Sequence, residues 1–374
     1  MTTFVHSTQS YLQGSRTLPR ERFVSEENFA REQKRIFGQS WLCVGRAEQI
    51  PNAGDYFVFN SGAESLIILR DRQNVINAHF NVCRHRGTRV CEEASGKFRG
   101  SIQCPYHAWT YDLQGNLIGA PNMDKVENFQ KENNPLHRAA LREWEGFLFV
   151  NLSSAPEPFE RVFAPLLGKF SEWQIANLRS ARRIEYHVHA NWKLIVQNYS
   201  ECNHCALVHP ELVKKSPPTS GHNDLTAGPF LGGYMELDHA VGSMTMTGRI
   251  SAPPIPSLSG ENLNRVYYYS IFPNMLLSLH PDYVMYHTLT PLSPSASRVT
   301  CDWLFHPDAF ARPDFHPEDA VDFWDMTNRQ DWHVCEISQL GIQSRVYQPS
   351  PYAPNESLPA AFDREYLLAM ETDR

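Results

Sequence analysis

Two short cysteine–histidine pairs constrain this chain more than any other feature. Cys83 and His85 stand in the segment NVCRHRGT, and Cys104 and His107 stand in IQCPYHAWT, with eighteen residues between His85 and Cys104. Each segment also carries a glycine or a proline, which favours a tight turn. Two thiols and two imidazoles on two turns predict a fold that brings the turns together around a metal centre.

The ligand types alone leave two kinds of centre open. Four-coordinate zinc accepts two cysteines and two histidines. In a Rieske [2Fe–2S] cluster, two histidines replace two cysteines on one iron and raise the reduction potential to roughly −150 to +300 mV. The Cys-x-His order differs from the Cys-x-x-Cys beginning of zinc ribbons, and two tight turns can direct backbone N–H groups at sulfur. These details favour the cluster.

The sequence around the two pairs predicts a small antiparallel β domain. The runs DYFVF, SLIILR, VINAHF and GFLFVNL alternate or are apolar, and Gly, Asn and Asp turns separate them. Before this region, residues 25–38 predict a surface helix with Ser25 as its N-cap and Gly38 at its end. After it, residues 161–174 predict a second helix, and residues 183–191 predict a strand.

A second candidate metal site lies in residues 191–210, NWKLIVQNYSECNHCALVHP. Helical spacing places Glu201 and His204 on neighbouring turns at the end of a helix. His209 would point away in an unbroken helix, but a residue before a proline is pushed out of the α region. Pro210 therefore lets His209 turn towards the same point. Two imidazoles and one carboxylate from elsewhere form the set of ligands that holds non-haem Fe(II).

The residues around the first two pairs resemble a known family. CRHRGT and CPYHAWTYDLQGNL are similar to the cluster loops of Rieske non-haem iron oxygenases, the α subunits of ring-hydroxylating oxygenases and their relatives. The resemblance implies that Cys83 and Cys104 bind one iron, and that His85 and His107 bind the other, solvent-facing iron. It also implies an α+β fold: an antiparallel β Rieske domain and a helix-grip-like catalytic domain with an antiparallel sheet and long helices.

The segment NWKLIVQNYSEC and the histidines after it resemble the iron-binding segment of the same oxygenases. The resemblance implies that His204 and His209 are iron ligands and that Asn198 lies beside the iron. Glu201 would be an acidic bridge that hydrogen-bonds His107 of a neighbouring subunit. The bridge is usually Asp, and Glu occurs in the branch that acts on quaternary ammonium compounds. The residue before His204 is Asn where Tyr is frequent, which affects the shape of the pocket.

The third ligand is expected on a C-terminal helix. Residues 317–341 form the strongest helical pattern in this half of the chain and carry several acidic residues. The segment RQDWHVCEISQLG resembles the carboxylate-bearing helix of the family, so Asp331 is the expected ligand. Asp325 is the alternative.

Aromatic strands fill the sequence between the two parts of this site. VYYYSIF, MLLSLH, YVMYHTLT and VTCDWLFH predict antiparallel strands packed on the long helices. Alternation sets Tyr267 and Tyr269 on one face and Tyr268 with Phe272 on the other. Aromatic faces bind a methylated ammonium by cation–π attraction. The expected substrate pocket comprises Tyr267, Tyr269, Tyr286, Phe272 and Trp303.

The resemblance implies a terminal oxygenase that uses O2 and electrons from NAD(P)H. A flavin and iron–sulfur reductase, with or without a ferredoxin, would be the partner. The expected reaction is hydroxylation or N-demethylation of a small quaternary ammonium compound, and the alternative is mono- or dioxygenation of an aromatic or other small carboxylate. The family also implies a head-to-tail homotrimer. Two other classes stay open: a Rieske-type electron carrier without oxygenase activity, and a zinc protein that uses both sites.

The expected organisation has three parts. Residues 1–44 form an N-terminal helical segment that packs on the catalytic domain, residues 45–155 form the Rieske domain, and residues 156–374 form the mononuclear iron domain. A net charge of −7 argues against a nucleic-acid partner. The N-terminus has no signal-peptide core, and no run of about eighteen apolar residues occurs, so the expected location is the cytoplasm, without membrane attachment.

The cysteines outside the metal motifs are expected to be reduced in that compartment. Cys202 and Cys205 form a Cys-x-x-Cys that fits a zinc or redox pair, but small buried helix residues are the expected role. The remaining four are interpreted as packing residues: Cys43, Cys91, Cys301 and Cys335.

Overall fold

The computed structural model describes residues 3–7 and 14–371 and divides into two compact units. Unit 1 comprises Met1–Ile36 and Glu160–Arg374, and unit 2 comprises Phe37–Phe159. Residues 37–44, which the sequence analysis grouped with the N-terminal segment, belong to unit 2. The reason is that β2 (Leu42–Arg46) pairs with β11 (Phe147–Asn151).

Unit 2 consists of small antiparallel sheets, as the alternating runs predicted. One sheet has the order β5-β4-β3-β6, a second β10-β11-β2, and a third β7-β8-β9. The remaining strands of this unit are β3 (Asp55–Ser61), β4 (Glu64–Arg70), β5 (Ile76–Phe80), β6 (Ser95–Lys97), β7 (Ile102–Gln103), β8 (Thr110–Tyr111), β9 (Leu117–Gly119) and β10 (Ala140–Trp144).

Unit 1 is built on an eight-stranded antiparallel sheet with the order β1-β13-β14-β15-β16-β17-β18-β12. The aromatic and β-branched runs of the sequence form its central strands, where both faces are covered. Its strands are β1 (Val5–His6), β12 (Arg179–Val188), β13 (His222–Leu225), β14 (Phe230–Glu236), β15 (Arg265–Ile271), β16 (Met275–Leu279), β17 (Tyr283–Ser293) and β18 (Ala296–Phe305).

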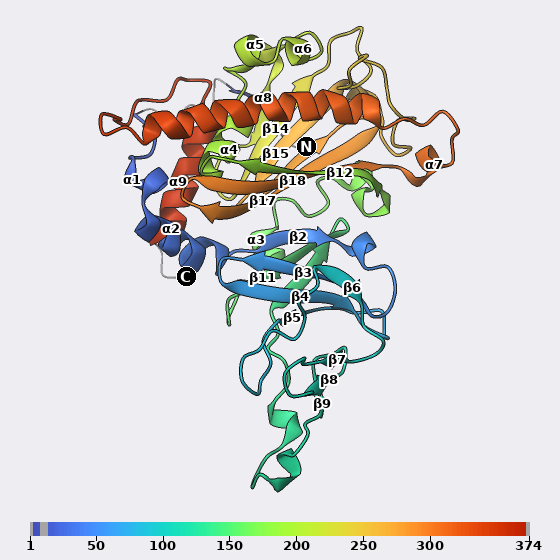
Figure 1. The fold of residues 1–374 in the computed structure, drawn as a ribbon. Helices are drawn as coiled ribbons and strands as arrows, with labels where there is room; N and C mark the ends of the chain where they lie inside the picture. The colour runs from blue at the N-terminus through green and yellow to red at the C-terminus, as the bar shows by residue number, and fades with distance from the viewer. Residues whose placement is uncertain (1–2, 8–13, 372–374) are drawn as a thin grey trace. The chain divides into compact units, whose positions relative to one another are not determined.

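Long helices cover one face of this sheet. The predicted C-terminal helix is α8 (Glu318–Ile342), which crosses the sheet in Figure 1. It packs beside α4 (Trp192–Tyr199), and α4 also contacts α9 (Ser357–Glu371). The shorter helices are α1 (Glu21–Val24), α2 (Glu26–Glu32), α3 (Phe159–Val162), α5 (Cys205–Val208), α6 (Pro210–Val213) and α7 (Pro307–Phe310). Single 3₁₀ turns are Ala47–Gln49, Met123–Lys125, Lys131–Asn133, Ser171–Trp173, Ile175–Asn177, Pro218–Ser220 and Gly260–Asn264.

A buried ion pair joins the N-terminal helices to the sheet-covering helices. Lys193 Nζ lies 2.6 Å from Glu32 Oε1, and both side chains are fully buried. The Glu32 carboxylate also accepts hydrogen bonds from Trp192 Nε1 at 2.9 Å and from Tyr366 Oη at 2.8 Å. Burial lowers the pKa of Lys193, and the attraction of Glu32 opposes this shift. The pair therefore holds α2, α4 and α9 together at a fully buried point.

Two helix predictions need correction in detail. Ser25 caps α2 by accepting from the backbone N–H of Asn28, as predicted, but the last turn is a π-helix over Gln33–Phe37. The helix predicted over residues 161–174 is wrong, because α3 ends at Val162 and turns and 3₁₀ segments follow. A proline and a glycine in APLLGK interrupt the helical pattern there.

Within the described part of the chain, no helix combines the length and the apolar character needed to cross a membrane.

Candidate metal centres

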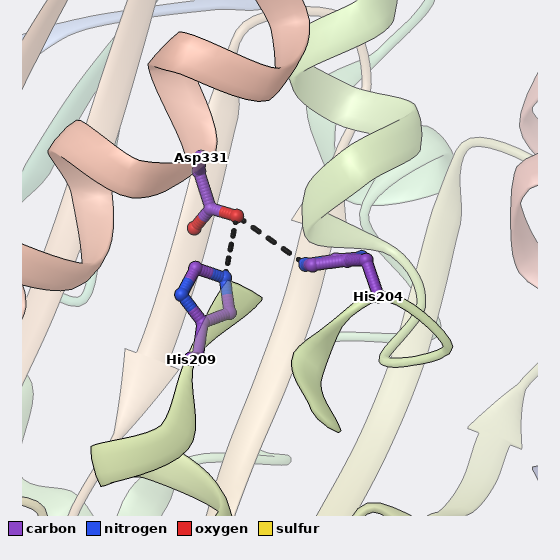
Figure 2. Close-up of side chains that lie close together, drawn as sticks. All are labelled: His204, His209 and Asp331. Carbon is purple, nitrogen blue, oxygen red and sulfur yellow. Dashed lines mark hydrogen bonds and ion pairs between the residues drawn. The ribbon is translucent and has the colours of Figure 1, made fainter. Parts of the chain in front are cut away.

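Two histidines and one carboxylate from distant parts of the sequence meet in unit 1 (Figure 2). His209 Nε2 lies 2.8 Å from Asp331 Oδ1, and His204 Nε2 lies 3.3 Å from the same oxygen. One ligand atom of each residue lies within 4.8 Å of the other two, so the three can hold one metal ion. The side chains are largely buried: His209 is 2% exposed. This is the two-histidine, one-carboxylate set of non-haem Fe(II) sites.

The local backbone explains how His204 and His209 reach one point. The prediction that one helix carries Glu201 and His204 is wrong, because α4 ends at Tyr199 and residues 201–204 form a turn before α5. His209 has φ −123° and ψ 65° and lies outside the helical region, and Pro210 begins α6. The predicted effect of Pro210 on His209 is therefore present.

A hydrogen bond at Nδ1 orients each imidazole. His204 Nδ1 lies 2.6 Å from Glu201 Oε1, and His209 Nδ1 lies 2.7 Å from Gln330 Oε1. When Nδ1 carries the proton for these bonds, Nε2 is the atom left for a metal, which is the usual arrangement around metal-bound histidines. The sequence motifs did not identify Gln330 as a site residue, although it directly precedes the expected ligand Asp331.

The acidic neighbours shift the protonation of the metal-free site. Burial lowers the pKa of His204, but the hydrogen bonds to Asp331 and Glu201 outweigh it and raise the pKa to about 10. Burial raises the pKa of Asp331, and the hydrogen bonds from His204 and His209 outweigh it, so the pKa is lowered. The three groups thus carry a proton that a metal ion must displace.

Of two further predicted residues, Asn198 lies at the metal site and Asp325 does not. Asn198 Nδ2 lies 3.4 Å from His204 Nε2, so this asparagine stands beside the metal position. Asp325, the alternative ligand, accepts a hydrogen bond from Tyr186 Oη at 2.7 Å and pairs with Arg329 at 2.9 Å. It is not in the group that can hold a metal among the described residues.

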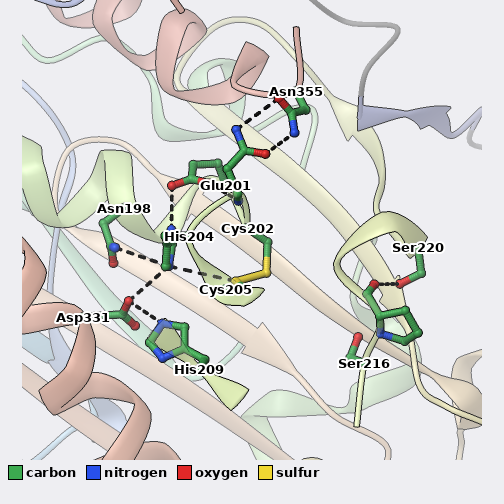
Figure 3. The surroundings of a disulfide bond; sticks show 12 residues. Asn198, Glu201, Cys202, His204, Cys205, His209, Ser216, Ser220, Asp331 and Asn355 are labelled. Atoms are coloured by element: carbon green, nitrogen blue, oxygen red, sulfur yellow. Dashed lines mark hydrogen bonds and ion pairs between the residues drawn. A yellow bond between two sulfur atoms is a disulfide. The ribbon is translucent and has the colours of Figure 1, made fainter. Parts of the chain in front are cut away.

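A disulfide joins Cys202 and Cys205 next to this site (Figure 3). The expectation that both are reduced packing residues in a helix is wrong, because the chain turns here and brings the two sulfurs together. The cysteines expected to pack in the core are buried and form no disulfide: Cys43, Cys91, Cys301 and Cys335.

His204, His209 and Asp331 line a cavity with about 1040 Å³ of space, part of it open to solvent. Aromatic walls come from Tyr199, Tyr234, Tyr268 and Trp324. Neutral polar groups and glycines complete much of the lining. Of the described residues that line the cavity, none is Lys or Arg, and the two acidic ones are Glu201 and Asp331.

The expected aromatic pocket needs correction, because none of its five members lines this cavity. Alternation along β15 was predicted rightly, but the helices cover the face that carries Tyr268. Tyr267 and Tyr269 face the other way and pack against Trp173 and Phe170. Cross-strand register puts Tyr286 on their face. Phe272 packs against Trp192 and Phe362, and Trp303 is fully buried within the fold.

The cysteine–histidine pairs of unit 2 lie on two tight turns. Cys83 accepts through its backbone oxygen from the N–H of Gly87 at 3.0 Å, and Cys104 accepts in the same way from Ala108 at 3.1 Å. Both cysteines are buried, at 2% and 3% exposure. Tyr111 Oη lies 3.4 Å from Cys83 Sγ, within hydrogen-bonding reach of a cluster sulfur ligand.

The histidines lie towards the solvent side of the same turns. The rings of His85 and His107 have centroids 4.7 Å apart, and His85 stacks on Trp109 at 4.9 Å. A tetrahedral zinc ion would need four donors within about 4 Å of one another. The four residues do not form a single-ion group among the described residues. Buried thiols on one side, with an exposed His85 and a half-buried His107 on the other, suit two irons in one cluster.

Comparison with known families gives two matches. Residues 175–372 match the model described as "Ring hydroxylating alpha subunit (catalytic domain)". Residues 40–130 match the Rieske [2Fe-2S] domain.

Individual relatives extend these matches over most of the chain. The sequence is 32% identical to the glycine betaine monooxygenase oxygenase subunit of Chromohalobacter salexigens, over 91% of this chain and 82% of that protein. It is 37% identical to the carnitine monooxygenase oxygenase subunit of Acinetobacter baumannii, over 52% of this chain and 53% of the relative. Choline monooxygenase of Atriplex hortensis is 23% identical over 90% of this chain and 74% of its own.

Solved structures confirm the predicted fold class. A quaternary ammonium Rieske monooxygenase superposes with a TM-score of 0.80 at 24% identity and covers 96% of both chains. Naphthalene 1,2-dioxygenase from Rhodococcus sp. superposes with a TM-score of 0.76 at 20% identity, over 96% of this chain and 95% of its own. At these identities the likeness shows the fold alone.

Proposed function

Because this chain belongs to the family of ring-hydroxylating oxygenase α subunits and is a Rieske non-haem iron oxygenase, we propose that it oxidises a small quaternary ammonium compound. The family uses a Rieske [2Fe–2S] cluster, a mononuclear iron, O2, and electrons that originate in NAD(P)H and arrive through a reductase. The proposal therefore concerns which residues hold these groups and which substrate enters the cavity.

His204, His209 and Asp331 are the proposed ligands of the mononuclear iron. When bound, the iron supplies the activation of dioxygen and leaves ligand positions open for it. The chain's own part is to present two Nε2 atoms and a carboxylate within 4.8 Å of one another. Glu201 and Gln330 hold the two rings, and the buried position of His209 excludes water from one side.

Cys83, Cys104, His85 and His107 are the proposed ligands of the cluster. Glu201 is the proposed bridge to His107 of a neighbouring subunit in a head-to-tail homotrimer. Its support in this chain is position: Glu201 Oε1 accepts a hydrogen bond from His204, and the side chain is only partly buried, at 13% exposure. Such a carboxylate can join the electron-delivering and the electron-receiving side. Because the electrons come from NAD(P)H, we place the protein in the cytoplasm with a flavin and iron–sulfur reductase.

The charge of the cavity is the main support for a quaternary ammonium substrate. Its described lining has four aromatic side chains, two carboxylates and no Lys or Arg. Aromatic faces attract a methylated ammonium, and the attraction increases when the cation is desolvated. The two carboxylates offset the charge of the iron. Because no Lys or Arg stands in the described lining, the cavity offers neither side chain to pair with an anionic substrate. The names of the relatives, which act on glycine betaine, carnitine and choline, point the same way.

Oxygenation of an aromatic carboxylate is the second candidate, since the fold of naphthalene dioxygenase is shared. The absence of Lys and Arg from the described lining of the cavity disfavours it. An electron carrier without oxygenase activity would have no use for the His204, His209 and Asp331 group in unit 1.

The decisive experiment measures oxygen uptake and product formation by the reconstituted iron-loaded protein with a reductase. Glycine betaine, carnitine, choline and aromatic acids are compared at equal concentration. The proposal expects coupled uptake with at least one quaternary ammonium compound and none with aromatic acids; the reverse pattern would refute the substrate assignment.

A Glu201→Gln variant should keep both metals and fail to couple cluster reduction to oxygenation. Normal product formation in that variant would remove the bridging role.

A further inference from the structure

The disulfide between Cys202 and Cys205 encloses the turn that carries a metal-site histidine. His204 lies between the two cysteines in sequence, and Glu201 directly precedes them. Cys205 Sγ lies 4.0 Å from His204 Nε2, the ring atom that faces Asp331. Figure 3 shows the Cys205 sulfur beside the ring of His204, next to the group that can hold a metal.

The turn is held in its present shape by a small number of contacts. The backbone N–H of Asn203 donates to Glu201 Oε2, while Glu201 Oε1 accepts from His204 Nδ1 at 2.6 Å. The side-chain amide of Asn203 also pairs with that of Asn355 at 3.1 Å. Each contact involves a residue inside or next to the disulfide ring. Opening the ring would free the backbone that positions both Glu201 and His204.

Global stabilisation is a poor explanation for this disulfide. A cross-link stabilises a fold mainly by restricting the unfolded chain, and the restriction grows with the length of the closed loop. The residues joined here are only three apart in sequence. The effect of the bond is therefore local, on the turn itself.

The pair is also accessible to small molecules. Both cysteines line the cavity that opens to solvent, and Cys202 is only partly buried. Cys205 is buried at 3% exposure but lines this cavity, whereas the four cysteines of the core are buried, form no disulfide and do not line it. Accessible disulfides are the ones that exchange with external thiols.

We propose that Cys202 and Cys205 form a reversible redox centre that sets how firmly the turn holds His204 and Glu201, and through them the metal. In the reducing direction, a small dithiol attacks one sulfur. The S–S bond breaks, two electrons and two protons pass to Cys202 and Cys205, and the dithiol leaves as its own disulfide. In the oxidising direction, hydrogen peroxide takes two electrons and two protons from the thiols and becomes two molecules of water.

The disulfide state is the state that retains the metal. With the ring closed, Nδ1 of His204 stays bonded to Glu201 and Nε2 stays directed at Asp331. With the ring open, the turn keeps one backbone bond, from the Cys205 N–H to the Cys202 oxygen at 3.3 Å, and the hydrogen bonds of Glu201 and Asn203. Loss of such orienting contacts lowers metal affinity by about 10–100-fold in other sites.

The first test detects the redox change itself. Full-length, iron-loaded protein is equilibrated anaerobically with dithiothreitol at different ratios of its reduced and oxidised forms, and free thiols are then alkylated and located by mass spectrometry. The proposal expects Cys202 and Cys205 to convert together between disulfide and alkylated thiols while Cys301 stays unchanged. A pair that remains reduced, or remains oxidised, across the whole series would overturn it.

The second test measures the transfer of iron to a colorimetric ferrous chelator in each state. The inference rests on iron binding by His204, and expects faster transfer from the dithiol state, whose iron affinity is about ten-fold lower. A Cys202→Ser, Cys205→Ser double variant should lose this dependence, whereas Cys301→Ser should keep it. Equal transfer in both states, or slower transfer from the dithiol state, would overturn the inference. Protein that never binds iron at this site would instead refute the proposed function, and the alkylation result would still stand.

Discussion

Gln330 accepts a hydrogen bond from Nδ1 of His209 at 2.7 Å, in the helical turn that also carries Asp331. The amide oxygen fixes which ring nitrogen carries the proton, and so leaves Nε2 for the metal. Gln330 is thus a positioning residue for the site.

Replacing Gln330 with Leu should weaken iron binding by about 10–100-fold, because the ring loses its orienting partner. The cluster in unit 2 should be unaffected. Competition with a ferrous chelator measures the change, and Gln330→Glu, which retains an acceptor oxygen, is the matched control that should restore most of the affinity. Wild-type affinity in the Leu variant would exclude the positioning role.

Asp331→Ala should remove the mononuclear iron and leave the cluster in place. Iron analysis should fall from about three to about two per chain, with acid-labile sulfide constant at about two. Asp325→Ala is the control on the same helix, because Asp325 pairs with Tyr186 and Arg329 instead. Loss of the third iron in the Asp325 variant, and not in the Asp331 variant, would reverse the assignment.

Iron binding should release protons, because the hydrogen bonds to Asp331 and Glu201 outweigh burial and raise the pKa of His204 in the metal-free site to about 10. At pH 8 we expect about one proton released per Fe(II) bound, and weaker binding as the pH falls. Calorimetry in two buffers of different ionisation enthalpy measures the release. Binding enthalpies that agree in both buffers would contradict the prediction.

The same shift predicts how the stability of the metal-free protein depends on pH. An unfolded histidine titrates near pH 6.5. The His204 contribution is therefore fully present below about pH 6.5 and is lost as the pH rises to about 10, the pKa in the fold. Thermal unfolding of the metal-free protein, compared with His204→Asn, should show this decline only with His204 present.

Tyr268→Leu should weaken the binding of a quaternary ammonium substrate by about 2- to 30-fold, since a cation–π contact contributes about 0.5–2 kcal/mol. Tyr268 lines the cavity from strand β15. Its sequence neighbour Tyr267 faces away, so Tyr267→Leu is a control with the same chemical change. Equal effects in the two variants, after correction for any difference in thermal stability, would count against Tyr268 as part of the substrate site.

Glu32→Gln should lower the free energy of unfolding of unit 1 by about 3–5 kcal/mol, because it leaves Lys193 as an unpaired buried charge. The double variant with Lys193→Met should recover much of that loss. Denaturant unfolding measures both. A double variant no more stable than the single one would show that the charge is not the cause.

Much of this site could be predicted from short motifs. Pro210 forces the backbone at His209 out of the helix by a local steric rule, and that rule holds in the fold. The period of two along β15 correctly separated Tyr268 from Tyr267 and Tyr269. Alternation does not say which face the helices cover, however, and that depends on packing between distant segments. Three of the five expected pocket residues, Tyr267, Tyr269 and Tyr286, were therefore taken from the wrong face.

The turn at Cys202 and Cys205 shows a second limit. Its residues are compatible with a continuing helix, in which two residues three apart also lie close together. The helix ends at Tyr199 instead, and tertiary contacts such as that between Asn203 and Asn355 fix the turn. Local helix propensity does not include a contact with a residue more than a hundred positions away, such as Asn355.

The two imidazoles differ in what holds them. The Nδ1 partner of His204 is three residues away, whereas both ring nitrogens of His209 are bonded to residues of α8, more than a hundred positions along the chain. Two hydrogen bonds therefore tie the ring of His209 to α8, so a displacement of the helix would carry the ring with it. An adjustment of the metal centre that leaves α8 in place must therefore come from the opposite side, through the short turn that carries His204.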